Sequence, residues 1–186
     1  MRELYQIFPS AFTDIQINKI LDLVRNESLL NASTFSSKIP SEDIRKSKVC
    51  WLSEDWIKNL LWEYILKVNN KSFKINVEKN SEVQFTEYFS EDNGHYDWHQ
   101  DVNWNGQTDI DRKISITVQL SNENDYDGGN FEFEVGAPHE KNRTEVLTPK
   151  LGCAIVFPSF MFHRVTPVTE GTRYSLVGWI CGKPYR

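Results

Sequence analysis

Three side chains in the second half of the chain could together bind one metal ion. His99 and Asp101 are two residues apart in the polar and aromatic segment 94–101. On an extended strand, residues two apart project to the same face, so both side chains can reach one ion. His163 follows an apolar run and supplies a third ligand. His139 is the alternative third ligand, but its segment is hydrophilic and we expect that side chain to be solvated.

Two histidines and one carboxylate indicate a particular kind of metal site. They occupy one face of an octahedral metal and leave three positions open, which is diagnostic of non-haem iron(II) oxygenases. A structural zinc site would be closed by four ligands, usually including cysteine, and no cysteine stands beside these residues. A His-x-Asp tripeptide often occurs by chance, and a lone histidine on an apolar strand is usually a hydrogen-bonded core residue. The presence of the His-x-Asp tripeptide and of His163 in the same chain favours the metal site.

A second chemical feature begins ten residues after His163. Arg173, Ser175 and Trp179 share one side of a predicted strand, and this side is too polar for a dry core. A buried guanidinium is always charged and can bind a carboxylate through two hydrogen bonds, so it suits the free end of a dicarboxylic cosubstrate. The competing interpretation places this side of the strand in solvent, with Arg173 in a surface salt bridge.

The elements that would position these side chains change type near residue 73. Apolar residues at helical spacing predict one helix over about 12–25 and a second from residue 53, where Ser-Glu-Asp is typical of an N-terminal cap. The polar segment 31–47 is interpreted as a loop. Alternating apolar residues then predict strands over 73–77, 83–88, 114–120, 131–135, 153–157 and 174–180. Short strands after a helical start predict an antiparallel sandwich or barrel backed by helices.

One predicted strand adds to the polar feature around Arg173. Ser115, Thr117 and Gln119 form a polar row along the strand over 114–120. If this strand faced the strand that carries Arg173, the two would line a polar cavity inside an otherwise apolar sandwich.

Composition limits the number of domains and the classes of partner that the chain could have. A chain of 186 residues suits a single domain that buries its own core. The net charge of −5 provides no overall basic field for nucleic acid or an anionic membrane. Three cysteines without a Cys-x-x-Cys spacing indicate reduced core thiols. Without a long apolar run or a cleavage-site pattern, we expect a soluble, cytoplasmic protein with no membrane span.

Taken together, the motifs resemble those of the iron(II)/2-oxoglutarate oxygenases, in particular the prolyl 4-hydroxylase-like and bacterial PKHD-type hydroxylases. The resemblance covers roughly residue 73 to the C-terminus, with a weaker match over 44–51; its matching segments are 88–101, 112–120, 126–133, 152–159 and 163–179. It implies a mainly β fold, a double-stranded β-helix or jelly roll, with N-terminal helices on the outer face of the major sheet. Residues 1–186 would form one domain, about 1–72 as helical support and 73–186 as the jelly-roll core.

The resemblance also implies roles at the metal site. His99, Asp101 and His163 would bind Fe(II) as the catalytic residues, and Arg173 would bind the distal carboxylate of 2-oxoglutarate. The implied cosubstrates are 2-oxoglutarate and O2, with ascorbate as a reductant. The aspartate argues against a halogenase, because halogenating relatives replace this carboxylate with a small residue.

Four further residues would line the cosubstrate site. Ser175, two residues after Arg173 on the same strand face, could add a hydrogen bond. The other three follow from the resemblance. Tyr88 and Trp179 match aromatic residues of the active-site wall. Gln119 stands where the hypoxia-sensing prolyl hydroxylases carry a second cosubstrate-binding tyrosine, a departure from the family pattern, although an amide could still donate to a carboxylate.

The implied reaction is hydroxylation of a C–H bond with decarboxylation of 2-oxoglutarate to succinate, and the favoured substrate is a prolyl residue in a peptide or protein. Trp98, Trp104 and Tyr126 could offer ring faces to proline, although each could equally be an ordinary core or rim residue. A free amino acid or other small molecule is the alternative substrate. A nucleic-acid demethylase should carry a second arginine six residues after the first, where Trp179 stands. A non-catalytic jelly-roll binding module fits poorly with an intact metal triad and Arg173.

Overall fold

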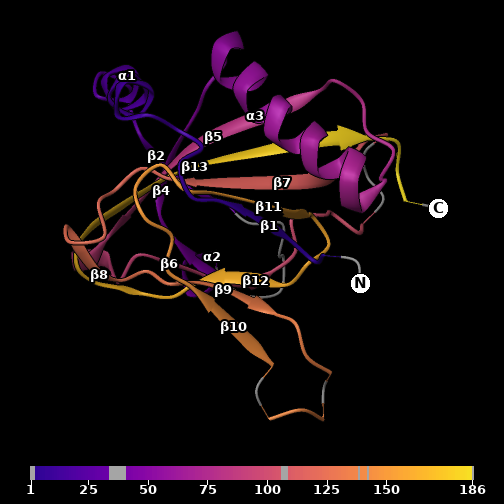
Figure 1. Cartoon of the computed structure of the whole chain (residues 1–186). Helices are drawn as coiled ribbons and strands as arrows, with labels where there is room; N and C mark the ends of the chain where they lie inside the picture. The colour runs from indigo at the N-terminus through magenta and orange to yellow at the C-terminus, as the bar shows by residue number, and fades with distance from the viewer. Residues whose placement is uncertain (1–2, 34–40, 106–108, 138, 142, 186) are drawn as a thin grey trace.

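The computed structural model describes residues 3–33, 41–105, 109–137, 139–141 and 143–185. Two antiparallel sheets form its centre (Figure 1). The larger sheet has the strand order β1 (Gln6–Phe8), β11 (Ala154–Pro158), β7 (Asp111–Gln119), β13 (Val168–Gly182), β5 (Ser81–Phe89), β4 (Lys48–Trp51) and β2 (Leu30–Asn31), and β8 (Tyr126–Gly128) pairs with β13. The smaller sheet has the order β10 (Thr144–Leu147), β9 (Phe131–Glu134), β12 (His163–Val165), β6 (His95–His99) and β3 (Arg45–Lys46).

Two long helices pack on the outer face of the larger sheet, as Figure 1 shows. Helix α1 (Asp14–Val24) begins with a capping box, because Thr13 and Gln16 bond each other's backbone N–H groups. Helix α3 (Asp55–Val68) has Glu54 as its N-cap, without a side-chain hydrogen bond. Both helices were predicted, but the polar cap expected at the start of the second is not formed. The shorter helical segments are α2 (Ser41–Ile44), the π-helix η1 (Asn69–Phe73) and the 3-10 helix η2 (Ser90–Asp92).

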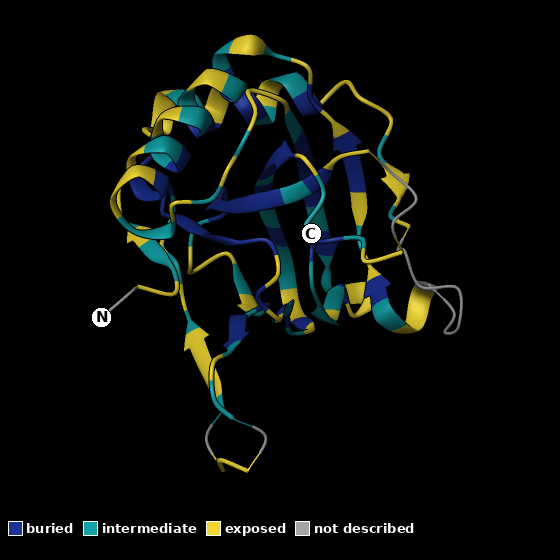
Figure 2. Cartoon of the chain, turned by 90° about the vertical axis from the view of Figure 1, so that its right-hand side faces the viewer, coloured by how far each residue is buried: buried dark blue, intermediate teal, exposed yellow. Residues whose placement is uncertain are grey.

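The main hydrophobic core lies between these helices and the larger sheet. One side of each central strand supplies it, including Phe85, Ile116, Val118, Leu176 and Ile180, all at most 2% exposed. Gly178 lets α3 approach closely, since a Cβ there would lie 2.6 Å from Leu61 Cδ1. Figure 2 shows the buried strands of the centre and the mostly exposed strand β10. A mainly β fold with helices on the outer face of the major sheet is therefore confirmed.

The strand predicted over 73–77 is wrong. Phe73 ends η1, Lys74 adopts a left-handed conformation with φ of 56°, and residues 75–78 belong to no helix or strand. Phe73, Ile75 and Val77 still pack against the core, so their alternation reflects burial rather than pairing. The first third of the chain is also more than helical support, because strands β1–β4 lie in it.

The segment predicted as a loop over 31–47 contains α2 and β3, and residues 34–40 of it lie outside the described residues. Within the part of the chain that the structure describes, no helix has the length and apolar character needed to cross a membrane.

The inner face of the larger sheet carries the predicted polar rows. Strands β7 and β13 are paired neighbours, with Gln119 opposite Ser175, Thr117 opposite Val177 and Ser115 opposite Trp179. The rows therefore lie side by side in one sheet rather than facing each other across a cavity. Ser115, Thr117, Gln119, Arg173 and Ser175 are all buried, which excludes the interpretation that this side of the strand is in solvent.

Candidate metal and cosubstrate site

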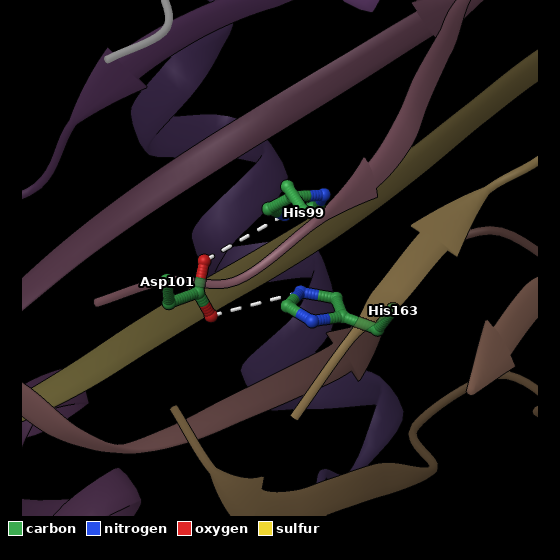
Figure 3. Close-up of side chains that lie close together, drawn as sticks. All are labelled: His99, Asp101 and His163. Carbon is green, nitrogen blue, oxygen red and sulfur yellow. Dashed lines mark ion pairs between the residues drawn. The ribbon is translucent and has the colours of Figure 1, made fainter. Parts of the chain in front are cut away.

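The three predicted metal ligands converge between the two sheets (Figure 3). His99 is the last residue of β6, His163 is the first of β12, and the two pair directly in the smaller sheet. Asp101 lies two residues beyond the end of β6, so the two side chains reach the same place without sharing an extended strand. One ligand atom from each of the three residues lies within 4.8 Å of the others, close enough to hold one metal ion.

Both imidazole rings present a free nitrogen to the aspartate. His99 Nδ1 lies 2.7 Å from the Asp97 carbonyl oxygen, and His163 Nδ1 lies 2.9 Å from that of Met161. A carbonyl oxygen only accepts, so each Nδ1 carries a hydrogen and each neutral ring keeps its lone pair on Nε2. These Nε2 atoms lie 3.7 Å and 3.6 Å from the two Asp101 oxygens. The rings are therefore held in the tautomer that binds a metal through Nε2.

Burial and charge set the protonation of this cluster. Burial lowers the pKa of His99 well below its usual value, and the nearby His163 lowers it further. Burial acts to raise the pKa of Asp101, but His163, His99, Arg112 and the Ser115 hydroxyl together outweigh it and lower that pKa. A neutral imidazole beside an ionised carboxylate is the state that a divalent metal requires.

A chain of hydrogen bonds from the larger sheet holds the Asp101 carboxylate. Ser115 on β7 donates to Asp101 Oδ2 at 2.6 Å, and the Ser159 hydroxyl lies 2.9 Å from the Ser115 hydroxyl. The Asp101 backbone N–H also donates to the Ser159 carbonyl at 2.9 Å. These contacts fix a ligand that no strand supports, since β6 has already ended.

The Tyr96 ring packs against the ring of the predicted metal ligand His99. Their rings are stacked, with centroids 3.4 Å apart and planes 10° apart. The Arg45 guanidinium carbon lies 4.5 Å from the Tyr96 ring centre, and Arg45 Nη2 donates to Gln84 Oε1 at 2.9 Å. Burial, opposed by Arg45, raises the pKa of Tyr96 to about 12, so its phenol is neutral near neutral pH.

Arg173 is the most unusual residue of the polar face. It is 1% exposed, and its Nε and Nη1 atoms have no hydrogen-bond partner among the described residues. Leaving a buried guanidinium without an anion costs several kcal/mol. The Tyr88 ring centre, 5.6 Å from the guanidinium carbon, gives only partial compensation. The donor set therefore fits a ligand that brings a carboxylate to Arg173.

The remaining predicted cosubstrate residues all lie on the same polar face. Tyr88 pairs with Arg173 across β5 and β13, and Ser175 pairs with Gln119. Trp179 lies under the Arg112 guanidinium at 3.7 Å, and its Nε1 is buried without a partner among the described residues. Both hydrogens of the Gln119 amide are committed, to the Ser121 carbonyl at 3.2 Å and the Tyr126 hydroxyl at 2.9 Å.

The polar face and the metal ligands meet at Ser115 and Phe157. Ser115 binds Asp101, and the Phe157 ring lies 4.8 Å from the His163 ring. His139 is exposed and lies outside the metal cluster, as expected.

Sequence reasoning assigned no site role to Ser159, linked the segment 92–96 only to substrate specificity and not to support of a metal ligand, and placed Ser115 only in a polar row. A small polar residue pointing inward beside the metal ligands was the available signal for Ser115. The Ser159 and Tyr96 contacts depend on how the strands pair.

Comparison with known proteins agrees with this geometry. The sequence pattern of the 2OG-Fe(II) oxygenase superfamily matches residues 83–181. A PKHD-type hydroxylase from Hyphomonas neptunium is 39% identical over 75 residues, 40% of this chain and 31% of that protein. One from Rippkaea orientalis is 28% identical over 179 residues, 91% of this chain and 75% of that protein. The chain thus spans about a third of the Hyphomonas relative and three quarters of the other.

Solved structures show the same fold. A prolyl-4-hydroxylase from Pseudomonas putida superposes with a TM-score of 0.73 at 20% identity, covering 95% of this chain and 92% of that one. A prolyl hydroxylase from Trichoplax adhaerens, in complex with a hypoxia inducible factor peptide fragment, also gives 0.73 at 17% identity, covering 95% and 83%. With its sequence match over more than half its length, its jelly-roll fold and its His-Asp-His cluster, the chain belongs to the 2OG-Fe(II) oxygenase superfamily.

Proposed function

We propose that the protein is an Fe(II)- and 2-oxoglutarate-dependent dioxygenase that hydroxylates a prolyl residue in a peptide or protein. The Fe(II) and 2-oxoglutarate dependence is supported by the buried guanidinium of Arg173, whose Nε and Nη1 atoms have no hydrogen-bond partner among the described residues. It lies on the same polar face whose Ser115 donates to Asp101. A dicarboxylic 2-oxo acid suits both features, because it can chelate a metal at one end and meet Arg173 at the other.

Each residue has a defined task in this proposal. His99, Asp101 and His163 hold the iron, and Ser115 keeps the Asp101 carboxylate in place. Arg173 binds the distal carboxylate of 2-oxoglutarate. Tyr88, Ser175 and Trp179 form the surrounding wall, on the same sheet face as Arg173.

Bound iron would supply the activation of O2 for oxidative decarboxylation of 2-oxoglutarate to succinate and for transfer of one oxygen atom to the substrate. The chain orients the reactants and excludes water from a face whose side chains are almost fully buried. Ascorbate as a reductant remains part of the proposal.

A prolyl substrate is supported by the named relatives and by exposed aromatic groups. Trp104 is 58% exposed, and its Nε1 donates to Gln100, the residue between His99 and Asp101. The Tyr185 ring packs beside it, with ring centres 5.6 Å apart, but the Lys113 ammonium lies 3.2 Å from the Tyr185 ring centre, so Trp104 is the more accessible of the two. Flat rings of this kind pack well on proline. Trp98 is less suitable, because the Arg164 guanidinium covers it at 4.7 Å.

The substrate assignment is tested by following both products. Proline-containing peptides should stimulate succinate formation by the iron-loaded protein and gain one oxygen atom on the proline ring, measured by mass spectrometry. Free proline should be much poorer. If free proline or another amino acid is hydroxylated efficiently while a broad peptide set stays inert, a small-molecule hydroxylase replaces the peptide hydroxylase.

The residue roles are tested by binding. His163→Ala should abolish tight Mn(II) or Fe(II) binding, whereas His139→Ala should leave it unchanged. Arg173→Ala should weaken 2-oxoglutarate binding by about 2–5 kcal/mol, the usual cost of truncating one partner of a buried charge pair, while metal binding survives. Unchanged metal affinity in His163→Ala would refute the triad.

A further inference from the structure

Tyr126 lies beside the polar face, and beyond the ring face that it could offer to proline, its hydroxyl has no role in the account so far. It begins β8 and pairs with Gly171 of β13, two residues before Arg173. Its hydroxyl oxygen accepts a hydrogen bond from Gln119 Nε2 at 2.9 Å. Gln119 is itself 1% exposed, so this contact lies at the edge of the buried face.

The orientation of the Gln119 amide follows from its surroundings. Its Nε2 lies 3.2 Å from the Ser121 carbonyl oxygen, a position that only a hydrogen-bond donor can occupy favourably. Turning the amide over would place Oε1 against that carbonyl. The two amide hydrogens are therefore used by Ser121 and Tyr126, and Oε1 is left buried without a partner among the described residues. An oxygen acceptor cannot pair with a carboxylate, so Gln119 does not donate to one directly.

The Tyr126 hydroxyl retains one hydrogen to donate. A phenol carries one hydrogen and two acceptor positions, and Gln119 uses an acceptor position. In the described part of the chain, no acceptor bonds this hydrogen. A hydroxyl that receives a hydrogen bond becomes a better donor itself, so Gln119 prepares Tyr126 to bind an acceptor.

Gly129 brings Tyr126 and Arg173 together. A Cβ at this glycine would lie 2.9 Å from Arg173 Cδ and 3.2 Å from Tyr126 Cε2, so both side chains border the space that a side chain at position 129 would need. Its φ of +58° also favours glycine. A side chain at position 129 would displace both residues, and glycine lets the Tyr126 ring and the Arg173 side chain lie close to each other.

We propose that the Tyr126 hydroxyl donates a hydrogen bond to the distal carboxylate of 2-oxoglutarate, beside Arg173, and that Gln119 acts as a positioning residue behind it. This inference rests on the proposed function, since it needs the cosubstrate to reach Arg173. The carboxylate would then meet both a fixed positive charge and a neutral donor, which together favour a dicarboxylic acid over a 2-oxo acid with an apolar tail.

The test measures binding to the Mn(II)-loaded protein by calorimetry, without turnover. Tyr126→Phe keeps the ring against Gly129 and removes only the hydroxyl. It should weaken 2-oxoglutarate binding by about tenfold, as expected for one hydrogen bond to a charged group. Binding of 2-oxobutanoate, which lacks the distal carboxylate, and of Mn(II) should be unchanged. Tyr174→Phe is the matched control, because Tyr174 stands next to Arg173 in sequence but packs into the helix-facing core.

A double-mutant cycle tests whether Gln119 acts on 2-oxoglutarate binding through Tyr126 or independently of it. Gln119→Leu should weaken 2-oxoglutarate binding alone but add little in the Tyr126→Phe background. Equal affinity of Tyr126→Phe and the wild type for 2-oxoglutarate would overturn the inference, as would an undiminished effect of Gln119→Leu in that background. If the wild-type protein itself does not bind 2-oxoglutarate, the proposed function fails instead.

Discussion

The two faces of the larger sheet are made by the same strands but carry opposite kinds of side chain. Toward the helices, β5, β7 and β13 present Phe85, Ile116 and Leu176, whose burial stabilises the fold. Toward the smaller sheet, the same strands present Thr86, Ser115, Thr117, Gln119 and Arg173, which are equally buried but polar.

Buried polar groups stabilise a protein only when they are paired. On the inner face Ser115 is paired, whereas Arg173, Gln119 and Trp179 each keep an unpartnered polar atom in the described structure. The comparison teaches that stability resides mainly on one face and ligand recognition on the other, so substitutions on the two faces should affect different measurements.

The largest expected effect on stability comes from the helix-facing side. Phe85→Ala should lower the free energy of unfolding by about 3–5 kcal/mol, because it leaves a cavity in the helix-facing core beside Tyr174. Chemical denaturation measures this loss. At temperatures where the variant stays folded, its Mn(II) affinity should equal that of the wild type; a coupled loss of metal affinity would show that the faces are not separable.

Substitution of a metal ligand should have the opposite effect, a large loss of Mn(II) affinity with a small change in stability. Asp101→Ala should weaken Mn(II) binding by at least about 100-fold, more than the loss of an outer-shell partner usually costs. The stability of the metal-free protein should change far less than in Phe85→Ala, because the substitution also removes a buried carboxylate. Calorimetry with Mn(II) measures the affinity, and chemical denaturation without metal measures the stability. A normal Mn(II) affinity in Asp101→Ala would contradict the assigned site.

A smaller effect is expected at Ser115, which touches Asp101 but no metal. Ser115→Ala should weaken Mn(II) binding by about tenfold, as for other outer-shell partners, because the Asp101 carboxylate loses its 2.6 Å hydrogen bond. Ser115→Thr, which keeps the hydroxyl, should largely restore the affinity. If the alanine variant binds Mn(II) normally, the hydrogen-bond chain does not position Asp101.

Much of this division could be predicted from sequence, because strand alternation assigns residues to faces without knowledge of the partner strands. The same rule failed over 73–77, where apolar residues alternate in a segment that packs on the core without pairing. Strands β1–β4 are only two to four residues long, too short for a period to be recognised.

The triad and Arg173 could be found from residue type and spacing. Contacts that depend on strand register could not. The Ser115–Asp101 bond joins residues 14 apart through a turn beyond β6, and the bond from Gln119 to Tyr126 depends on β8 pairing with β13. A departure from a family pattern at Gln119 could be noticed in the sequence, but only the structure shows which neighbour its amide binds.

The central claim is that Arg173 is kept for ligand binding and not for stability. The most direct measurement is the free energy of unfolding of the wild type and of Arg173→Met, each with and without Mn(II) and 2-oxoglutarate. Without ligands, Arg173→Met should be at least as stable as the wild type, because methionine removes a buried charge whose Nε and Nη1 atoms have no hydrogen-bond partner in the described structure. With 2-oxoglutarate at 100 times its dissociation constant, the wild type should gain about 2.7 kcal/mol beyond the effect of Mn(II) alone and the variant almost nothing. A variant that is several kcal/mol less stable without ligands, or that gains as much from 2-oxoglutarate, would contradict the account.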